Sequence, residues 1–190
     1  MLTDLLSEIA RNLDETQLPY VIIGGQAVLL YGEPRLTRDI DITLGVGLSE
    51  LPRLLEMVSQ IGLQILVEDP VSFVQKTWVL PVWHGSSGFR VDFIFSWTEY
   101  ERIAVGRARQ IILKGYPVNY ATPEDLIIHK IFSGRPRDLE DVRAILLKQD
   151  VNMEEIMKWL KEFEKTTGEN YLKTFEKVVK EARGVSRGNK

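Results

Sequence analysis

A pair of glycines interrupts the first strand-like segment of the chain and constrains what can follow it. Residues 20–23 are apolar and favour a strand, and Gly24 and Gly25 break it. Residues 26–31 then favour a short helix, and residues 39–44 resume as a strand rich in β-branched side chains. The order predicts a strand, a glycine turn, a helix and a second strand.

Two aspartates, Asp39 and Asp41, open that second strand. Side chains alternate along a strand, so both carboxylates lie on one face about 7 Å apart, while Ile40 and Ile42 face the core. Like charges this close repel each other unless a cation lies between them. Oxygen ligands in this arrangement suit Mg²⁺ or Mn²⁺, which keep several waters and take further ligands from substrate phosphates.

The glycine pair and the helix after it predict an anion site. Glycine lets the backbone turn sharply and approach a ligand closely, and the first turn of a helix presents unpaired amides and a positive dipole end. Residues 35–38, between this turn and the aspartates, contain two arginines that either neutralise phosphate charge or brace the carboxylates. We therefore expect phosphate oxygens beside the carboxylate pair.

A third acid stands within an apolar strand-like segment, residues 89–95. An isolated acid in such a segment requires an explanation, and Asp92 on a neighbouring strand gives a third metal ligand. Glu68 and Asp69 are alternatives, but neither lies within an apolar strand. Three carboxylates can hold two cations about 4 Å apart, one beside an attacking hydroxyl and one beside a leaving pyrophosphate.

The rest of the chain predicts a mixed α/β (α+β) fold that ends in helices alone. The expected helices begin near Thr3, Ser49, Thr98, Thr122 and Arg137, and residues 152–183 form one or two more. The further expected strands are 73–83, 89–97, 109–113 and 117–120. The first two of these strands pair as one hairpin, and the last two pair as another. Residues 184–190 are expected to fray. Residues 1–121 form the expected catalytic core and 122–190 a helical extension that packs on it; the alternative is one single domain.

Composition excludes several classes of site. The 190 residues include no cysteine, so disulfides, thiolate zinc sites and cysteine nucleophiles are absent, and His84 and His129 lack metal-ligand spacing. A net charge of −3 argues against general attraction to nucleic acid. No apolar run approaches the ~20 residues that span a bilayer, and the acid-containing residues 1–16 are typical of neither signal nor transit peptide, so we expect a cytoplasmic protein that does not bind membranes.

Two sets of residues resemble the sequence motifs of a known protein family. The first is Gly24-Gly25-Gln26-Ala27, Gly32, Arg35, Thr37, Asp39-Ile40-Asp41 and Asp92, and the second is Thr122-Pro123-Glu124-Asp125, Lys130, Arg137-Asp138 and Asp141. The first set resembles the DNA-polymerase-beta-type nucleotidyltransferase superfamily. The second resembles the C-terminal signature of its minimal, AbiEii-toxin-like branch. The resemblance covers residues 20–148.

The resemblance implies a nucleotidyltransferase fold, in which helices flank a mixed sheet, acids line one edge of a cleft, and a helical part closes over the nucleotide. Asp39, Asp41 and Asp92 would ligate Mg²⁺ or Mn²⁺, with Asp92 also helping to deprotonate the acceptor, and Gly24 and Gly25 would receive the triphosphate. The other implied nucleotide-binding residues are Gln26, Arg35, Thr37, Lys130, Arg137, Asp138 and Asp141, of which the last two support or orient the others. Many relatives carry serine where this chain has Gly25, so backbone amides or Gln26 have to replace a hydroxyl contact.

The implied activity is Mg²⁺-dependent transfer of a nucleotidyl group from a nucleoside triphosphate to the hydroxyl of an RNA, a protein or a small alcohol. Two other readings stay open: a toxin–antitoxin-type nucleotide-binding component that acts through a partner protein such as a cognate antitoxin, and a degenerate structural domain. Lys130 is alternatively the polar face of a helix. Asp138 and Asp141 alternatively form surface pairs with Arg137 and Arg143.

Overall fold

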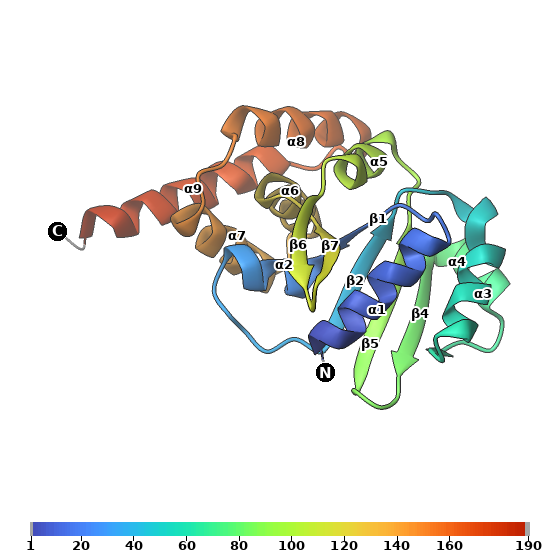
Figure 1. The fold of residues 1–190 in the computed structure, drawn as a ribbon. Coiled ribbons are helices and arrows are strands. Elements are labelled where there is room, and N and C mark those ends of the chain that lie inside the picture. Colours follow the sequence, from blue (N-terminus) through green and yellow to red (C-terminus); the bar gives the residue numbers. More distant parts are fainter. Residues whose placement is uncertain (1, 189–190) are drawn as a thin grey trace. The chain divides into compact units, whose positions relative to one another are not determined.

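The computed structural model describes residues 2–188 and divides the chain into two compact units. The sheet unit comprises the residues up to Gln26 together with Leu36–Ala121, and the helical unit comprises Ala27–Arg35 together with the residues from Thr122 onward. Figure 1 traces the elements of both units. The predicted mixed α/β fold, with a mixed sheet and flanking helices, is confirmed.

A seven-stranded mixed sheet forms the sheet unit, in the order β3-β4-β5-β2-β1-β7-β6. Its strands are β1 (Tyr20–Ile23), β2 (Asp39–Leu44), β3 (Gln64–Ile65), β4 (Val79–His84), β5 (Phe89–Phe95), β6 (Arg109–Leu113) and β7 (Tyr116–Tyr120). Strands β2 and β5 are parallel, as are β1 and β7, whereas the other pairs are antiparallel. The predicted hairpins are β4 with β5 and β6 with β7.

The central strands have two chemically different faces. Ile40 and Ile42 of β2 and Phe93 of β5 are fully buried on one face. Because side chains alternate, Asp41 and Asp92 lie on the other face, and both are half-buried. The strands therefore carry apolar core on one side and carboxylates on the other.

Helices α1 (Leu2–Glu15), α3 (Leu51–Gln60), α4 (Pro70–Thr77) and α5 (Glu99–Gly106) belong to the sheet unit (Figure 1). The apolar face of α1, which includes Leu5 and Leu13, is buried, and α1 contacts β6 and β7. Helix α5 follows Thr98, where the sequence predicts a helix to begin, and its start carries a complete capping box between Thr98 and Glu101.

Helix α4 corrects the prediction of one long strand over 73–83. The Asp69 carboxylate accepts a hydrogen bond from the amide of Ser72 at 3.0 Å, and Pro70 occupies the first helical turn. This cap and proline together favour a helix over the β-propensity of the residues that follow. Trp78 then ends the helix in the left-handed conformation, so the strand starts only at Val79.

The start of α3 is a second correction. Ser49, predicted as its N-cap, lies inside a 3₁₀ helix (Leu48–Glu50). Glu50 occupies the N-cap position of α3 and makes no side-chain cap hydrogen bond, while Pro52 sits in the first helical turn. The tighter turn shifts the N-cap, and with it the start of the α-helix, by one residue.

The helical unit contains α6 (Pro123–Ser133), α7 (Pro136–Lys148), α8 (Met153–Thr167) and α9 (Tyr171–Gly188). The Thr122 hydroxyl caps α6, as predicted, and Gly134 ends it with φ +64°. The expectation of fraying from residue 184 is wrong as far as Gly188, where α9 ends, and residues 189–190 lie outside the described range. Between residues 2 and 188, none of the helices combines the length and apolarity that crossing a bilayer requires.

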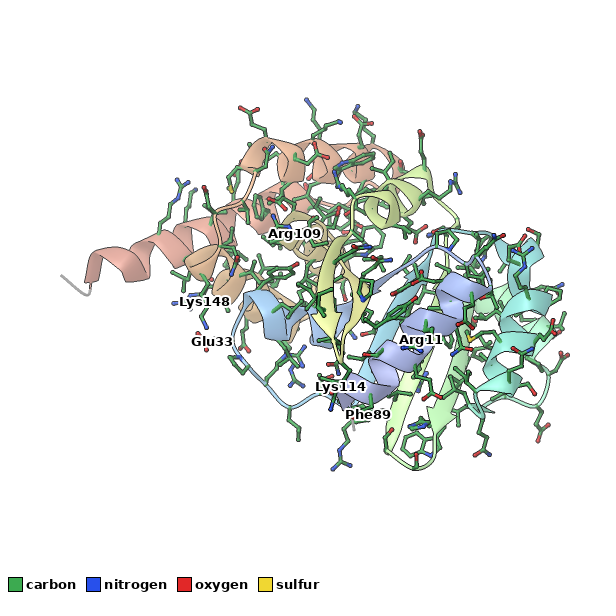
Figure 2. All side chains as sticks on the ribbon, in the orientation of Figure 1. Arg11, Glu33, Phe89, Arg109, Lys114 and Lys148 are labelled. Atoms are coloured by element: carbon green, nitrogen blue, oxygen red, sulfur yellow. The ribbon has the colours of Figure 1, made fainter. Side chains whose placement is uncertain are left out.

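Residues 27–35 are held to α7 within the helical unit by an ion pair and a hydrogen bond. The Lys148 ammonium forms an ion pair with Glu33 at 2.7 Å and donates a hydrogen bond to the carbonyl of Gly32 at 3.0 Å. Both side chains are labelled in Figure 2. These residues include Ala27–Tyr31 of α2 (Gly24–Tyr31), whose first three residues belong to the sheet unit.

Candidate active site

Strand register places the three aspartates on one face of two adjacent strands. In the parallel pairing of β2 and β5, the Cα atoms of Asp41 and Asp92 are partners, and those of Asp39 and Arg90 are partners. Adjacent strands lie about 4.8 Å apart, and the two residues of a parallel pair project to the same face. The carboxylates of Asp41 and Asp92 can therefore converge by side-chain rotation alone.

The side chains of these acids have different surroundings. Asp39 is exposed, whereas Asp92 is half-buried and accepts a hydrogen bond from Arg90 Nε at 2.9 Å. Among residues 2–188, no three His, Asp or Glu side chains are already gathered as a metal-binding group. The donor set thus fits a hard divalent cation in ligand type and strand register, while Arg90 engages one of its members. Arg90 was not among the predicted site residues, although its position two residues before Asp92 assigns it to the same face.

The glycine turn lies directly beside Asp41. Strand β1 ends at Ile23, whose register partner is Asp41, so Gly24 follows next to that carboxylate. Gly24 has φ +62°, and a Cβ built on it would lie 1.9 Å from Asp41 Oδ2. Only glycine fits here, for both conformation and space.

Helix α2 starts two residues earlier than predicted. The sequence suggested Gln26 as its first residue, but the helix begins at Gly24. The glycine pair therefore forms the first turn of α2 and is not a separate loop before it. Its amides are those that a helix leaves without intrahelical partners, which makes this turn suited to an anion.

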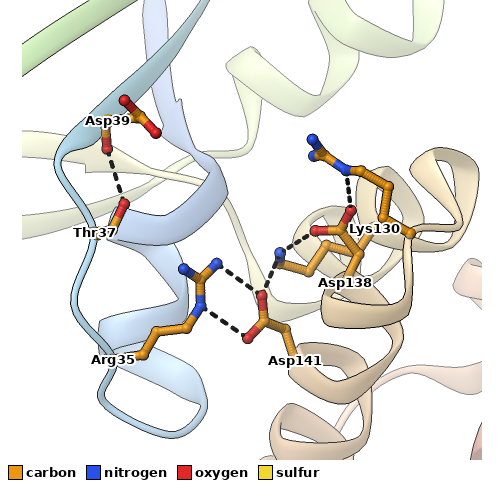
Figure 3. A network of polar contacts seen from close by, with 7 residues as sticks. Arg35, Thr37, Asp39, Lys130, Asp138 and Asp141 are labelled. Atoms are coloured by element: carbon orange, nitrogen blue, oxygen red, sulfur yellow. Dashed lines mark hydrogen bonds and ion pairs between the residues drawn. The ribbon is translucent and has the colours of Figure 1, made fainter.

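Thr37 explains why this chain has no side chain at position 25. A Cβ built on Gly25 would lie 2.7 Å from Thr37 Oγ1 and 3.0 Å from Thr37 Cβ. The threonine thus fills the space that a serine at position 25 would need, and it places a hydroxyl next to the glycine turn. This hydroxyl donates a long hydrogen bond of 3.4 Å to the carbonyl oxygen of Asp39 (Figure 3).

Gln26 is directed inward. Its side chain is buried, and Nε2 donates to the carbonyl oxygen of Asp39 at 3.3 Å. Two side chains, those of Gln26 and Thr37, therefore hold the backbone at the start of β2. The structure places Gln26 as a brace for the aspartate strand.

Lys130 lies in a buried ion cluster of the helical unit. Its Nζ donates to Asp138 Oδ1 at 2.8 Å and to Asp141 Oδ2 at 2.7 Å, and all three side chains are less than a tenth exposed (Figure 3). This arrangement differs from the solvated helix face that was the alternative reading of these residues. Contact between Lys130 and a phosphate would require the exchange of an existing ion pair.

Two arginines complete this cluster. Arg35 makes a two-bond fork with Asp141, at 3.1 Å from Nε to Oδ1 and 3.0 Å from Nη2 to Oδ2. Arg135, which the sequence analysis did not single out, donates from Nε to Asp138 Oδ2 at 2.7 Å. The ion-pair partners of the two aspartates are thus Lys130, Arg35 and Arg135, whereas the predicted Arg137 is exposed.

The pKa of Asp138 reflects opposing effects. Burial raises it, while hydrogen bonds from Lys130 and Arg135 lower it, and the net result is a pKa below the ordinary value of 3.8. Asp138 is therefore held as a carboxylate by its cationic partners. The buried charges of Asp138 and Asp141 are compensated by Lys130 together with Arg35 and Arg135.

A cavity of about 710 Å³ lies within the helical unit, lined by α6, α7 and α9. At its edge, the ring of Phe132 stacks on Tyr171 with centroids 5.3 Å apart. None of its described lining residues is a predicted metal ligand or nucleotide contact.

Comparisons with known proteins agree with the fold. Residues 107–183 match the model of a family described as "Nucleotidyltransferase of unknown function (DUF6036)". The antibiotic-resistance factor ANT(2'')-Ia is similar in structure, with TM-score 0.62 and 19% identity over 88% of this chain and 93% of that one. A second structure of ANT(2'')-Ia, in complex with adenylyl-2''-tobramycin, gives TM-score 0.59 and 20% identity over 87% and 98%.

An antigenic nucleotidyltransferase-like protein from Paracoccidioides brasiliensis is also similar, with TM-score 0.56 and 18% identity over 88% of each chain. A comparison with curated protein sequences found no match. At these identities the likeness concerns the fold, and the chain has the nucleotidyltransferase fold.

Proposed function

We propose that this chain is a metal-dependent nucleotidyltransferase, which transfers a nucleotidyl group from a nucleoside triphosphate to a hydroxyl acceptor and releases pyrophosphate. The observation that carries the proposal is the pairing of Asp41 with Asp92 across β2 and β5, with Asp39 on the same face and Gly24 alongside. The nucleotidyltransferase fold and the family match over residues 107–183 support it.

Asp39, Asp41 and Asp92 are the residues that would hold Mg²⁺ or Mn²⁺. A divalent cation bound there supplies charge neutralisation for the phosphate oxygens and lowers the pKa of a coordinated hydroxyl. Oxygen-only ligands from two adjacent strands match the preference of these cations. One of these carboxylates, that of Asp92, forms an ion pair with Arg90.

The first turn of α2 is the proposed triphosphate site. Its amides and its positive dipole end attract the phosphate oxygens, and the missing side chains at Gly24 and Gly25 let the ligand approach the backbone. The Thr37 hydroxyl, beside Gly25, takes the place of the serine hydroxyl that many relatives have at position 25. These groups orient the α-phosphate for in-line attack.

The chemical step breaks one bond and forms another. The acceptor oxygen attacks the α-phosphorus, the bond from that phosphorus to the bridging oxygen of the β-phosphate breaks, and pyrophosphate leaves with the bonding electrons. In this proposal Asp92 helps to take the proton of the acceptor hydroxyl. Most of the rate enhancement then comes from positioning and charge neutralisation.

The acceptor is a hydroxyl-bearing molecule. The similar structures include one in complex with adenylyl-2''-tobramycin, which makes polyhydroxylated small molecules the first class to test. RNA ends and protein side chains carry the same reacting group. Membership of the AbiEii-toxin-like branch, and with it a partner antitoxin, stays a prediction from the sequence.

Labelled triphosphates test the proposal directly. Wild-type protein is incubated with Mg²⁺, a cell extract and each triphosphate, labelled at either the α- or the γ-phosphate, and acceptors are sorted into small molecules, RNA and protein. We expect transfer of the α-label only, with release of pyrophosphate, and none by Asp41→Asn. Transfer of the γ-label, or equal transfer by the variant, would contradict the proposal.

A further inference from the structure

Arg90 shares the carboxylate face of the sheet. It precedes Asp92 by two residues on β5, so both side chains project to the same side, and its Cα partner on β2 is Asp39. The face therefore carries a square of four charged residues, two on each strand. Three of them are acids and one is a base.

The guanidinium of Arg90 forms an ion pair with the carboxylate of Asp92. Its Nε donates to Asp92 Oδ1 at 2.9 Å, in an ion pair whose side chains are 47% and 20% exposed. The Asp41 carboxylate lies on the same face, and its Oδ2 is beside Gly24, the residue that follows β1. The two register partners therefore have their carboxylates beside different groups, Gly24 for Asp41 and Arg90 for Asp92. Among residues 2–188, no three acidic or histidine side chains are gathered as a metal-binding group.

This ion pair opposes cation binding in two ways. A divalent cation that takes Asp92 Oδ1 as a ligand would compete with the guanidinium that is hydrogen-bonded to this oxygen. A positive charge that stays nearby also repels the cation. An exposed ion pair is weak, so the opposition is a few-fold in affinity and does not block the site.

We propose that Arg90 competes with the metal for the Asp92 carboxylate. Arg90 forms an ion pair with Asp92 in the metal-free protein and releases this carboxylate when a divalent cation binds. The inference rests on the proposed function, because it takes Asp92 as a metal ligand. Arg90 is a positioning residue in this role, since it acts through the Asp92 carboxylate. It lowers the repulsion among the three acids while the cation is absent.

Mn²⁺ titration without nucleotide, followed by electron paramagnetic resonance of the free ion, tests the inference. We expect Arg90→Gln to bind Mn²⁺ about three- to tenfold more tightly than wild type, from the loss of a weak ion pair and of a nearby positive charge. Asp92→Asn should bind it less tightly. Arg53→Gln is the matched control, because Arg53 of α3 forms a similarly exposed ion pair, with Glu50 at 3.0 Å. This variant should leave the affinity for Mn²⁺ unchanged.

The possible outcomes separate the two proposals. If wild type binds Mn²⁺, Asp92→Asn weakens it and Arg90→Gln equals wild type, the role of Arg90 is overturned while the metal site stands. If neither wild type nor Arg90→Gln shows saturable binding, both proposals are overturned. Tighter binding by Arg90→Gln than by both wild type and Arg53→Gln supports the inference.

A second measurement follows the guanidinium itself. The Nε–Hε signal of Arg90 in a ¹⁵N NMR spectrum is assigned by its absence from Arg90→Gln. Addition of Mg²⁺ should shift this signal toward its position in Asp92→Asn, where the carboxylate partner is gone. A signal that does not move while Mg²⁺ saturates the site would overturn the displacement of Arg90.

Discussion

The carboxylate of Asp41 lies against the backbone of Gly24, so closely that a methyl group at position 24 would meet its Oδ2 at 1.9 Å. The same aspartate is the register partner of Asp92 across two parallel strands. One residue therefore joins the glycine turn to the second carboxylate strand. Changes at the turn and changes at the carboxylates should consequently affect each other.

Gly24→Ala should both destabilise the fold and displace Asp41. The new side chain would adopt φ +62° and collide with the carboxylate, which we expect to reduce the free energy of unfolding by about 1–3 kcal/mol. Urea denaturation measures this effect. Gly47→Ala is the control, because that glycine has φ −89° and open space around it, and a change beyond about 0.5 kcal/mol there would contradict the steric explanation.

Gly25→Ser and Thr37→Ala should be coupled. Serine at position 25 would meet Thr37 Oγ1 at 2.7 Å, so the single variant should lose about 1–2 kcal/mol of stability through overpacking. Removal of the threonine hydroxyl and methyl in the double variant should recover part of that loss. A double-mutant cycle by chemical denaturation measures the coupling, and strictly additive effects would show that the two positions do not compete for space.

Lys130→Met should be among the most destabilising single changes in the helical unit. It leaves Asp138 and Asp141 buried without their shared ammonium, at an expected cost of about 3–5 kcal/mol. Arg135→Ala provides the comparison, because that arginine also pairs with Asp138 but is 76% exposed, and its loss should cost about 1 kcal/mol or less. Equal effects in thermal or urea unfolding would show that burial does not distinguish the two ion pairs.

Acid should weaken the contribution of Asp138 to stability. Its pKa in the folded protein lies below 3.8, so its ion pairs stabilise the fold fully above about pH 5 and are lost as the pH falls below about 4 through the folded pKa. The stability difference between wild type and Asp138→Asn should therefore shrink at low pH. Unfolding measured between pH 3 and pH 7 gives this difference, and a constant value would contradict the lowered pKa.

Local sequence signals predicted much of the fold. Strands β1 and β2 have the bounds that their apolar and β-branched residues indicated, and Thr98 and Thr122 cap the helices that follow them. Helix α4 was missed because the aromatic and β-branched residues within 73–79 favour a strand. There the cap at Asp69 and Pro70 outweighs their propensity.

Contacts between distant residues were beyond sequence reasoning. The ion pair of Arg35 with Asp141 joins residues 106 positions apart, and only tertiary structure shows that this aspartate is buried. The ion pair of Arg90 with Asp92 is local, and strand alternation alone predicts that the two share a face. Its effect on a metal ligand depends on the register with β2, which no local pattern specifies.

The most direct test of the central claim is the thermal shift that a nucleoside triphosphate produces with and without Mg²⁺, because a ligand of the folded state raises its melting temperature. Wild type is compared with Asp41→Asn, which keeps the size of the side chain and removes its charge. We predict a shift in wild type that depends on Mg²⁺ and disappears in the variant. An equal Mg²⁺-dependent shift in both proteins would contradict the assignment of Asp41 as a metal ligand.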